Sequence, residues 1–222
     1  MTKAVIFDMD GVLTDTEPVI NVAAIQGLRE YGVEAHPEDF TPFVGAGEDR
    51  YIGGVAAKYG LTYRPEMKRR VYEIYLEILP RMIAPIPGVS ELLATLRRHS
   101  VPMAVATSAD RIKMRANLDA IEVPREWFRV IIVAEDVEQR KPAPDIYLTA
   151  AARLAVPASA CCVVEDALNG VQAAKRAGMR CVAVESSFPA DRLKTAGADT
   201  VRRALADVTL ADLGVGAGQA NR

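Results

Sequence analysis

Short, nearly continuous apolar runs recur along the 222-residue chain, and amphipathic stretches separate most of them. Each run has about four residues, which is typical of a parallel strand that is buried on both of its faces. The five runs are Ala4–Phe7, Met103–Ala106, Val130–Val133, Cys161–Val164 and Cys181–Val184.

Helical periodicity occupies the segments between the later runs. These amphipathic stretches are Val89–Arg98, Ile112–Ala120, Asp145–Leu154 and Leu168–Ala177. Gly178 follows the last of them, at a position where helices often end in a left-handed residue. The alternation of strand and helix predicts an α/β fold, with a Rossmann-like parallel sheet covered by helices on both faces.

The segment after the first run breaks this alternation. From Glu17 to Ala84 the apolar residues follow helical spacing, and no strand-like run occurs. The pattern predicts a helical domain at residues 17–84, inserted into a core domain formed by residues 1–16 and 85–222. The hinges are expected at Thr14, Asp15 and Thr16 and at Ala84–Gly88, where two prolines stiffen the chain.

The charge balance argues against a nucleic-acid partner, because 27 basic and 29 acidic residues give a formal net charge of -2. No apolar run approaches the length of a membrane span, and the N-terminal residues do not resemble a signal peptide. The three cysteines lie in apolar runs and are expected to be reduced and buried. We therefore expect a cytoplasmic protein without membrane contact, as a monomer or weak homodimer.

Polar side chains follow four of the predicted strands. They are Asp8 and Asp10, then Thr107 and Ser108, then Lys141, and finally Glu165 and Asp166. In open α/β sheets, ligands bind outside the carboxyl ends of the strands, so these groups are expected to form one site. Carboxylates suit a hard divalent cation, whereas a hydroxyl, an amine and backbone N–H groups suit a phosphate.

The order of these motifs resembles that of the haloacid dehalogenase (HAD) superfamily. The motifs are Asp8-Met9-Asp10-Gly11-Val12-Leu13-Thr14-Asp15-Thr16, Thr107-Ser108, Lys141-Pro142-Ala143-Pro144-Asp145, and Glu165-Asp166 followed by Asn169-Gly170. The resemblance covers essentially the whole chain. The helical insertion matches the cap of the subgroup that includes β-phosphoglucomutase and phosphoglycolate phosphatase, which implies a HAD core with an α-helical cap.

The resemblance implies a role for each of these residues. Asp8 would be the nucleophile that forms an aspartyl-phosphate, and Asp10 would be the general acid and base. Mg2+ would be held by Asp8, the backbone carbonyl of Asp10 and Asp166. The phosphoryl oxygens would be held by Thr107, Lys141 and the N–H groups of Ser108 and Ala109.

Three of these positions keep a second interpretation. Glu165 would either bind the metal directly or support residues that do. Ser108 would either contact the substrate or only cap a helix. Asn169 and Gly170 would either belong to the site or only pack in a helix.

A glycine-rich turn within the insertion is expected to set substrate specificity. This cap specificity loop contains Gly45, Gly47, Glu48 and Arg50. β-Phosphoglucomutase carries an Arg where this chain has Glu48, and a His where this chain has Ile20. An acidic Glu48 would repel a second phosphate.

These departures favour a Mg2+-dependent phosphatase of a small phosphorylated metabolite, such as a sugar phosphate. A phosphosugar mutase is the alternative within the same family. A non-catalytic module that binds a phosphometabolite is the alternative of another class, although Asp8, Asp10 and Lys141 are all present.

Overall fold

The computed structural model describes residues 1–44 and 46–216. Six parallel strands form one sheet in the order β3-β2-β1-β4-β5-β6. The strands are β1 (Ala4–Phe7), β2 (Met103–Ala106), β3 (Val130–Ile132), β4 (Cys161–Glu165), β5 (Arg180–Val184) and β6 (Thr200–Arg202). The strand order reverses around β1, which creates a switch point at the carboxyl ends of the central strands. The predicted α/β fold is confirmed.

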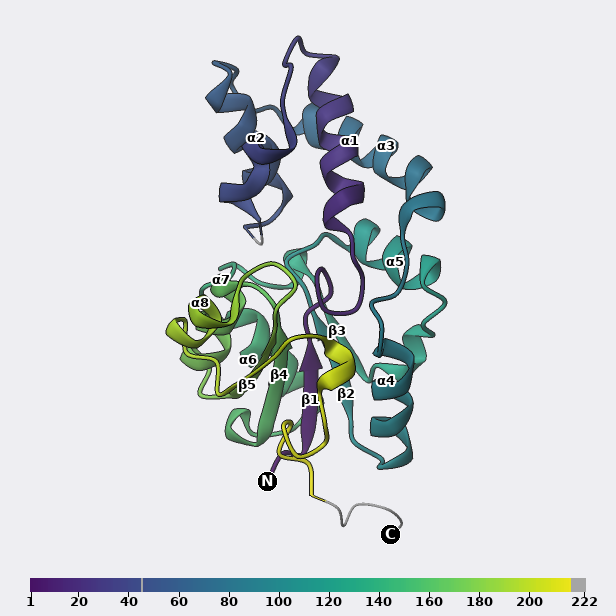
Figure 1. The fold of residues 1–222 in the computed structure, drawn as a ribbon, viewed down its shortest axis with the longest axis vertical. Helices are drawn as coiled ribbons and strands as arrows, with labels where there is room; N and C mark the ends of the chain where they lie inside the picture. Colours follow the sequence, from purple (N-terminus) through teal and green to yellow (C-terminus); the bar gives the residue numbers. More distant parts are fainter. Residues whose placement is uncertain (45, 217–222) are drawn as a thin grey trace.

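Helices cover both faces of the sheet (Figure 1). They are α4 (Val89–Arg98), α5 (Arg111–Ala120), α6 (Asp145–Leu154), α7 (Leu168–Arg176) and α8 (Ala190–Thr195). Short 3-10 turns lie between elements, at η2 (Arg125–Trp127), η3 (Ala134–Asp136), η4 (Ala158–Ala160) and η5 (Leu205–Asp207).

Alternation along the strands divides the core into two layers. Val5 and Phe7 pack with α4 and α5 on one face, whereas Ala4 and Ile6 pack with α6 and α7 on the other. Successive side chains of a strand point to opposite faces, so a strand between two helical layers must be apolar throughout. The apolar runs in the sequence reflect this requirement.

The sixth strand, β6, was not predicted from the sequence. It has three residues, Thr200, Val201 and Arg202, and each is only half-buried. An edge strand needs no apolar run on both faces, so its sequence lacks the signal that identified the other five. Its position is fixed by pairing with β5 and by an ion pair between Arg202 and Asp212.

A separate helical segment lies beyond the carboxyl ends of the strands (Figure 1). It contains α1 (Glu17–Arg29), η1 (Pro37–Phe43), α2 (Glu48–Lys58) and α3 (Pro65–Met82). The segment has its own apolar core, in which Leu28, Phe40, Ile52 and Val71 are buried. We call it the cap.

Two adjacent connections join the cap to the sheet. After β1 the chain turns sharply at Gly11, whose φ of +79° is favourable only for a residue without a side chain. Thr14 then pairs with Pro85 in an isolated bridge, and the Ile86 N–H donates to the Leu13 carbonyl at 3.3 Å. The outgoing and returning chains therefore run side by side.

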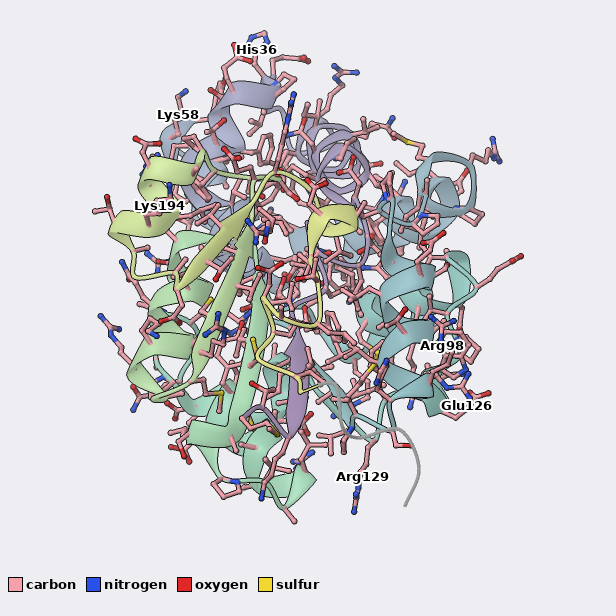
Figure 2. All side chains as sticks on the ribbon, turned by 60° about the horizontal axis from the view of Figure 1, so that its bottom comes forward. His36, Lys58, Arg98, Glu126, Arg129 and Lys194 are labelled. Atoms are coloured by element: carbon pink, nitrogen blue, oxygen red, sulfur yellow. The ribbon has the colours of Figure 1, made fainter. Side chains whose placement is uncertain are left out.

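The two histidines lie outside this junction. His36 is exposed at the outer end of the cap (Figure 2). His99 is half-buried at the end of α4. Among residues 1–44 and 46–216, none of the helices combines the length and apolar character needed to cross a bilayer.

Gly27 allows α1 and α3 to approach closely. A Cβ at this position would lie 2.7 Å from Val71 Cγ2 and 3.4 Å from Val71 Cα. We expect Gly27→Val to force the helices apart and to lower the free energy of unfolding of the cap by about 1–3 kcal/mol. Urea unfolding followed by the tyrosine signal measures this effect, because six of the seven tyrosines lie in the cap.

Trp127, the single tryptophan, lies outside the cap and reports on the sheet domain. In Gly27→Val, the urea unfolding transition followed by the Trp127 signal should shift less than the transition followed by the tyrosine signal. Gln26→Ala, at an exposed position of the same helix, is the matched control and should leave both transitions unchanged. Wild-type stability of Gly27→Val would contradict the proposed close packing.

Candidate active site

A cleft of about 730 Å³ lies between the carboxyl ends of the strands and the cap. Its floor is formed where strands end: Asp8 follows β1, Thr107 follows β2 and Glu165 ends β4. Its roof comes from the cap, through Glu17 and Glu48 among others. The cleft therefore coincides with the switch point of the sheet.

Lys141 bridges two carboxylates on the floor of the cleft. Its Nζ lies 2.5 Å from Asp8 Oδ1 and 2.7 Å from Glu165 Oε1, and it also donates to the Ala106 carbonyl at 3.3 Å. All three charged side chains are buried. The amine thus links the ends of three neighbouring strands, β1, β2 and β4.

Both carboxylate oxygens of Glu165 accept hydrogen bonds. Besides Lys141, Oε1 accepts a hydrogen bond from the Tyr147 hydroxyl at 2.8 Å. Oε2 accepts the backbone N–H groups of Asp166 and Ala167 at 2.8 and 2.9 Å. This arrangement leaves the carboxylate little freedom, and it favours the interpretation of Glu165 as a support for other site residues.

Burial changes the proton affinities of these groups. Desolvation raises the pKa of Asp8 to about 7, although the nearby Lys141 amine acts in the opposite direction. Burial also raises the pKa of Asp166 well above its ordinary value, and the carboxylates of Glu165 and Asp8 add to the effect. Burial disfavours the charged form of Lys141, but Asp8 and Glu165 outweigh it and raise the pKa of the amine.

Three acidic side chains converge closely enough to hold a cation. Oxygen atoms of Asp8, Glu165 and Asp166 lie within 4.8 Å of one another. A Cβ at Gly11 would lie 2.0 Å from Asp166 Oδ2, so only glycine lets the turn after β1 approach this carboxylate. Such oxygen-rich, buried clusters suit a hard divalent cation.

Thr107, Ser108 and Ala109 lie together along one side of the cleft. The Ala109 N–H donates to Thr107 Oγ1 at 3.0 Å, so this amide has an internal partner. Asp110 occupies the N-cap position of α5, which excludes Ser108 as its helix cap. The interpretation of Ser108 as the cap of this helix was therefore wrong, whereas its contact with substrate stays a prediction.

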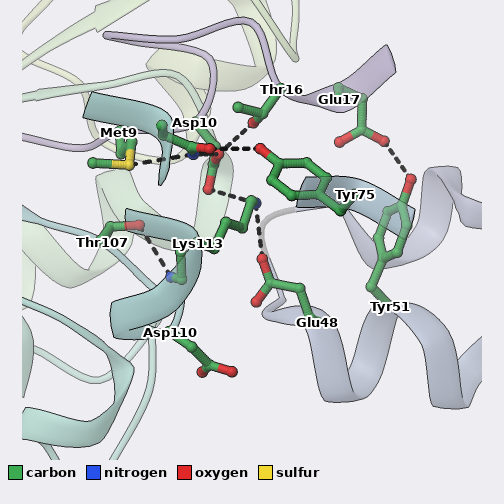
Figure 3. Close-up of polar contacts among 12 residues, drawn as sticks. Met9, Asp10, Thr16, Glu17, Glu48, Tyr51, Tyr75, Thr107, Asp110 and Lys113 are labelled. Carbon is green, nitrogen blue, oxygen red and sulfur yellow. Dashed lines mark hydrogen bonds and ion pairs between the residues drawn. The ribbon is translucent and has the colours of Figure 1, made fainter. Parts of the chain in front are cut away.

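Asp10 is surrounded by three side chains, and two of them were not identified from the sequence (Figure 3). Thr16, one of the expected hinge residues, donates its hydroxyl to Asp10 Oδ1. Asn117 Nδ2 lies 3.4 Å from the same oxygen, and Lys113 Nζ lies 3.0 Å from Oδ2. The other hinge residues differ in exposure: Thr14 is buried and Asp15 is exposed to the cleft.

Lys113 also reaches the cap. Its Nζ lies 2.8 Å from Glu48 Oε1, and the two side chains are only 4 % and 7 % exposed. The sequence analysis did not identify a partner for Glu48, and the structure shows that its carboxylate forms a buried ion pair with the core. Asp10 and Glu48 raise the pKa of Lys113 well above its ordinary value, although burial acts against the charged amine.

The remaining residues of the cap specificity loop differ in position. Gly45 lies outside the described residues. Gly47 lines the cleft, and a Cβ there would lie 2.6 Å from an Arg140 side-chain nitrogen. Arg50 is exposed and lines a different hollow of the cap with Gly53 and Tyr63, so it is not brought to the main cleft.

A buried carboxylate cluster at the switch point of a parallel sheet, bridged by a lysine and covered by a helical cap, defines an α/β enzyme. Residues 5–184 match the family described as haloacid dehalogenase-like hydrolase. The chain belongs to this family, and the resemblance inferred from the four motifs is confirmed.

Two curated relatives show different extents of similarity. The chain is 43 % identical over 99 % of its length to "Protein SUPPRESSOR OF QUENCHING 1, chloroplastic" of Arabidopsis thaliana, but it spans only 21 % of that protein. It is 33 % identical to "Phosphorylated carbohydrates phosphatase" of Thermotoga maritima, over 80 % of this chain and 82 % of the relative.

A solved structure shares the fold over nearly the whole chain. It is the structure of a CbbY mutant from Rhodobacter sphaeroides in complex with xylulose-(1,5)bisphosphate. The TM-score is 0.84 at 29 % identity, with 96 % of this chain and 99 % of the other covered.

Gly170 provides a test of how tightly Glu165 is held. A Cβ at Gly170 would lie 1.5 Å from Glu165 Oε1. In an ordinary helix interior, Gly→Ala stabilises by about 0.5–1 kcal/mol. Here we expect the opposite sign, a loss of about 2 kcal/mol or more in the free energy of unfolding, since Glu165 cannot move without losing its partners. Urea unfolding at neutral pH measures the change.

Gln172→Ala, at a half-buried position of the same helix, is the control for general effects on α7. In a Glu165→Ala background, the additional change Gly170→Ala should cost much less, because the clashing carboxylate is absent. A stabilising effect of Gly170→Ala in the wild-type background would contradict the rigid placement of Glu165.

Proposed function

We propose that the protein is a Mg2+-dependent phosphatase of a small phosphorylated metabolite and acts through an aspartyl-phosphate intermediate. The observation that carries the proposal is the position of Asp8, whose carboxylate lies 2.5 Å from Lys141 and within reach of Asp166 at the floor of the cleft. Asp10, two residues further on, lines the same cleft.

The donor set fits Mg2+. Asp8 and Asp166 supply hard carboxylate oxygens from two neighbouring strands, and the backbone carbonyl of Asp10 is the third expected ligand. Bound Mg2+ would neutralise charge between the anionic nucleophile and the phosphate. Glu165 would hold Lys141 and the turn after β4 in place, as its four hydrogen bonds indicate.

In the first step, an Asp8 carboxylate oxygen attacks phosphorus, and the bond between phosphorus and the leaving oxygen breaks. Asp10 donates its proton to that oxygen, so the alcohol leaves as a neutral molecule. Lys141 and Thr107 would hold the phosphoryl oxygens, together with the Ser108 and Ala109 N–H groups. For the Ala109 N–H, this requires the exchange of its hydrogen bond to Thr107.

In the second step, Asp10 takes a proton from water, and the water oxygen attacks the phosphorus of the aspartyl-phosphate. The bond between Asp8 and phosphorus breaks, which releases inorganic phosphate and restores the carboxylate. Thr16 and Asn117 would orient Asp10 for both transfers, because each contacts Oδ1.

Several observations support a small, sugar-like substrate. The cleft of about 730 Å³ has the size of a small-molecule site. The relative from Thermotoga maritima is described as a phosphatase of phosphorylated carbohydrates. A mutase would need groups that retain a second phosphate, and Ile20 and Glu48 occupy the two positions where β-phosphoglucomutase has a His and an Arg.

We further propose that residues 17–84 move as a cap relative to the core of residues 1–16 and 85–222. The adjacent connections at Thr14 and Pro85 would form the hinge. Closure would exclude water from the reacting groups and bring Glu48 to Lys113.

Asp8→Asn is the central test. We expect it to reduce phosphate release by at least about a thousandfold, because an amide cannot form the aspartyl-phosphate. Phosphate release is measured on p-nitrophenyl phosphate, sugar phosphates, phosphoglycolate and nucleotides, with Mg2+ and with EDTA. Asp119→Asn, at an exposed acid of α5 that does not line the cleft, is the control and should retain most activity. Retained turnover in Asp8→Asn, or equal turnover in EDTA, would contradict the proposal.

Mg2+ affinity should depend on pH through Asp8. The pKa of about 7 in the metal-free protein means that the carboxylate is mostly protonated at pH 6 and mostly ionised at pH 8. Because only the ionised form binds the cation, we expect Mg2+ affinity to rise about tenfold between these pH values. Isothermal titration calorimetry measures the change. Asp8→Asn should release fewer protons than the wild type on binding Mg2+, because only Asp166 remains of the two carboxyl ligands, and a pH-independent wild-type affinity would refute the assignment.

A further inference from the structure

Positive charge is scarce where the leaving group of a substrate would lie. Among the described residues that line the cleft, Lys113 and Lys141 are the basic ones. Lys141 lies on the floor beside Asp8, so only Lys113 is available toward the cap. Carboxylates are more numerous on this side, where Asp15, Glu17 and Glu48 line the cleft.

The charge of Lys113 is already compensated. Its amine lies between Asp10 Oδ2 at 3.0 Å and Glu48 Oε1 at 2.8 Å, as Figure 3 shows. Two carboxyl groups therefore share one buried cation, and Glu48 already balances the charge of the amine even while Asp10 carries the proton that it donates in the first step. An incoming phosphate would have to compete with both partners for this amine.

Glu48 keeps one oxygen without a donor. Oε2 is buried and has no hydrogen-bond partner among the described residues. Its negative charge is thus neutralised only through Oε1. A second phosphate at this end of the cleft would meet an acceptor of like charge in a site of low dielectric constant.

Arg50 does not supply the missing positive charge. It is exposed and belongs to the separate hollow on the cap, lined also by Asp49 and Tyr63. Arg140 lies beside Gly47 but is paired with Asp49 at 3.5 Å and is not part of the cleft lining. The described cap therefore offers no uncompensated cation to this end of the cleft.

Uncharged hydrogen-bond donors of a substrate, in contrast, would meet acceptors at this end of the cleft. The Glu17 side chain is exposed to the cleft and is oriented by the Tyr51 hydroxyl, which donates to Oε1 at 2.8 Å. A hydroxyl group near Glu17 could donate a hydrogen bond without adding charge. The chemistry of this wall therefore suits an uncharged polyol.

We propose that the Glu48–Lys113 pair is a specificity-determining element that restricts the enzyme to monophosphates with an uncharged, hydroxyl-bearing leaving group. The inference rests on the proposed phosphatase function and deepens it. A preference for monophosphates would distinguish this chain from the structurally similar CbbY mutant, whose structure contains a xylulose bisphosphate.

The test compares matched monophosphates and bisphosphates as inhibitors of p-nitrophenyl phosphate hydrolysis. The pairs are glucose 1-phosphate with glucose 1,6-bisphosphate, fructose 6-phosphate with fructose 1,6-bisphosphate, and xylulose 5-phosphate with xylulose 1,5-bisphosphate. For the wild type, we expect each bisphosphate to have an inhibition constant at least about tenfold above that of its monophosphate. Glu48→Gln should narrow this ratio severalfold, and Glu48→Arg should narrow it further or invert it.

Arg50→Gln is the matched control, since this side chain lies in the other hollow, and it should leave the ratio unchanged. Glu48→Gln keeps the size of the side chain. If Glu48→Arg does not fold, the test therefore depends on Glu48→Gln alone. Tighter binding of bisphosphates by the wild type would overturn the inference, as would a ratio that stays the same in a folded Glu48 variant. Absence of phosphate release from p-nitrophenyl phosphate and from every monophosphate would instead refute the phosphatase function itself.

Discussion

The buried amine of Lys141, held between Asp8 and Glu165, is the interaction on which the site depends. Each of the three charges would be costly to bury alone, and together they are tolerated because every charge has a close partner of opposite sign. The bridge joins strands that are far apart in sequence but adjacent in the sheet. It also fixes Asp8 without filling its second oxygen, so the residue proposed as the nucleophile is rigid yet accessible.

Much of the core could be predicted, because burial on both faces leaves a strong signal. The five runs match β1 to β5 within a residue or two, and α4 and α6 have the predicted bounds. The edge strand β6 lacked that signal, as it is short and half-buried. The floor of the site was also predictable, because a parallel sheet brings all strand ends to one edge and the motifs follow those ends.

The roof of the site could not be predicted in the same way. Lys113 and Asn117 lie one turn apart on α5, and Met114 and Leu118 beside them face the sheet. By periodicity alone the two polar residues belong to a solvent-exposed face. They are buried only because the cap lies over them, through contacts between residues that are 42 and 65 positions apart in the sequence. The sequence alone therefore could not identify Lys113 as the partner of Glu48. It also could not show that the charge of Glu48 in the cap specificity loop is compensated by this amine.

The side-by-side connections at Thr14 and Pro85 have a consequence for folding. β1 must pair with β2 across the whole cap, which lengthens the intervening loop by somewhat less than two doublings. Since each doubling of a flexible loop costs only about 0.6 kcal/mol in closure entropy, the insertion penalises the central strand pair by about 1 kcal/mol. A cap with its own apolar core shortens the effective loop further by bringing its two ends together. A parallel sheet can therefore tolerate a large insertion directly after its first strand, provided that the inserted segment begins and ends at the same place.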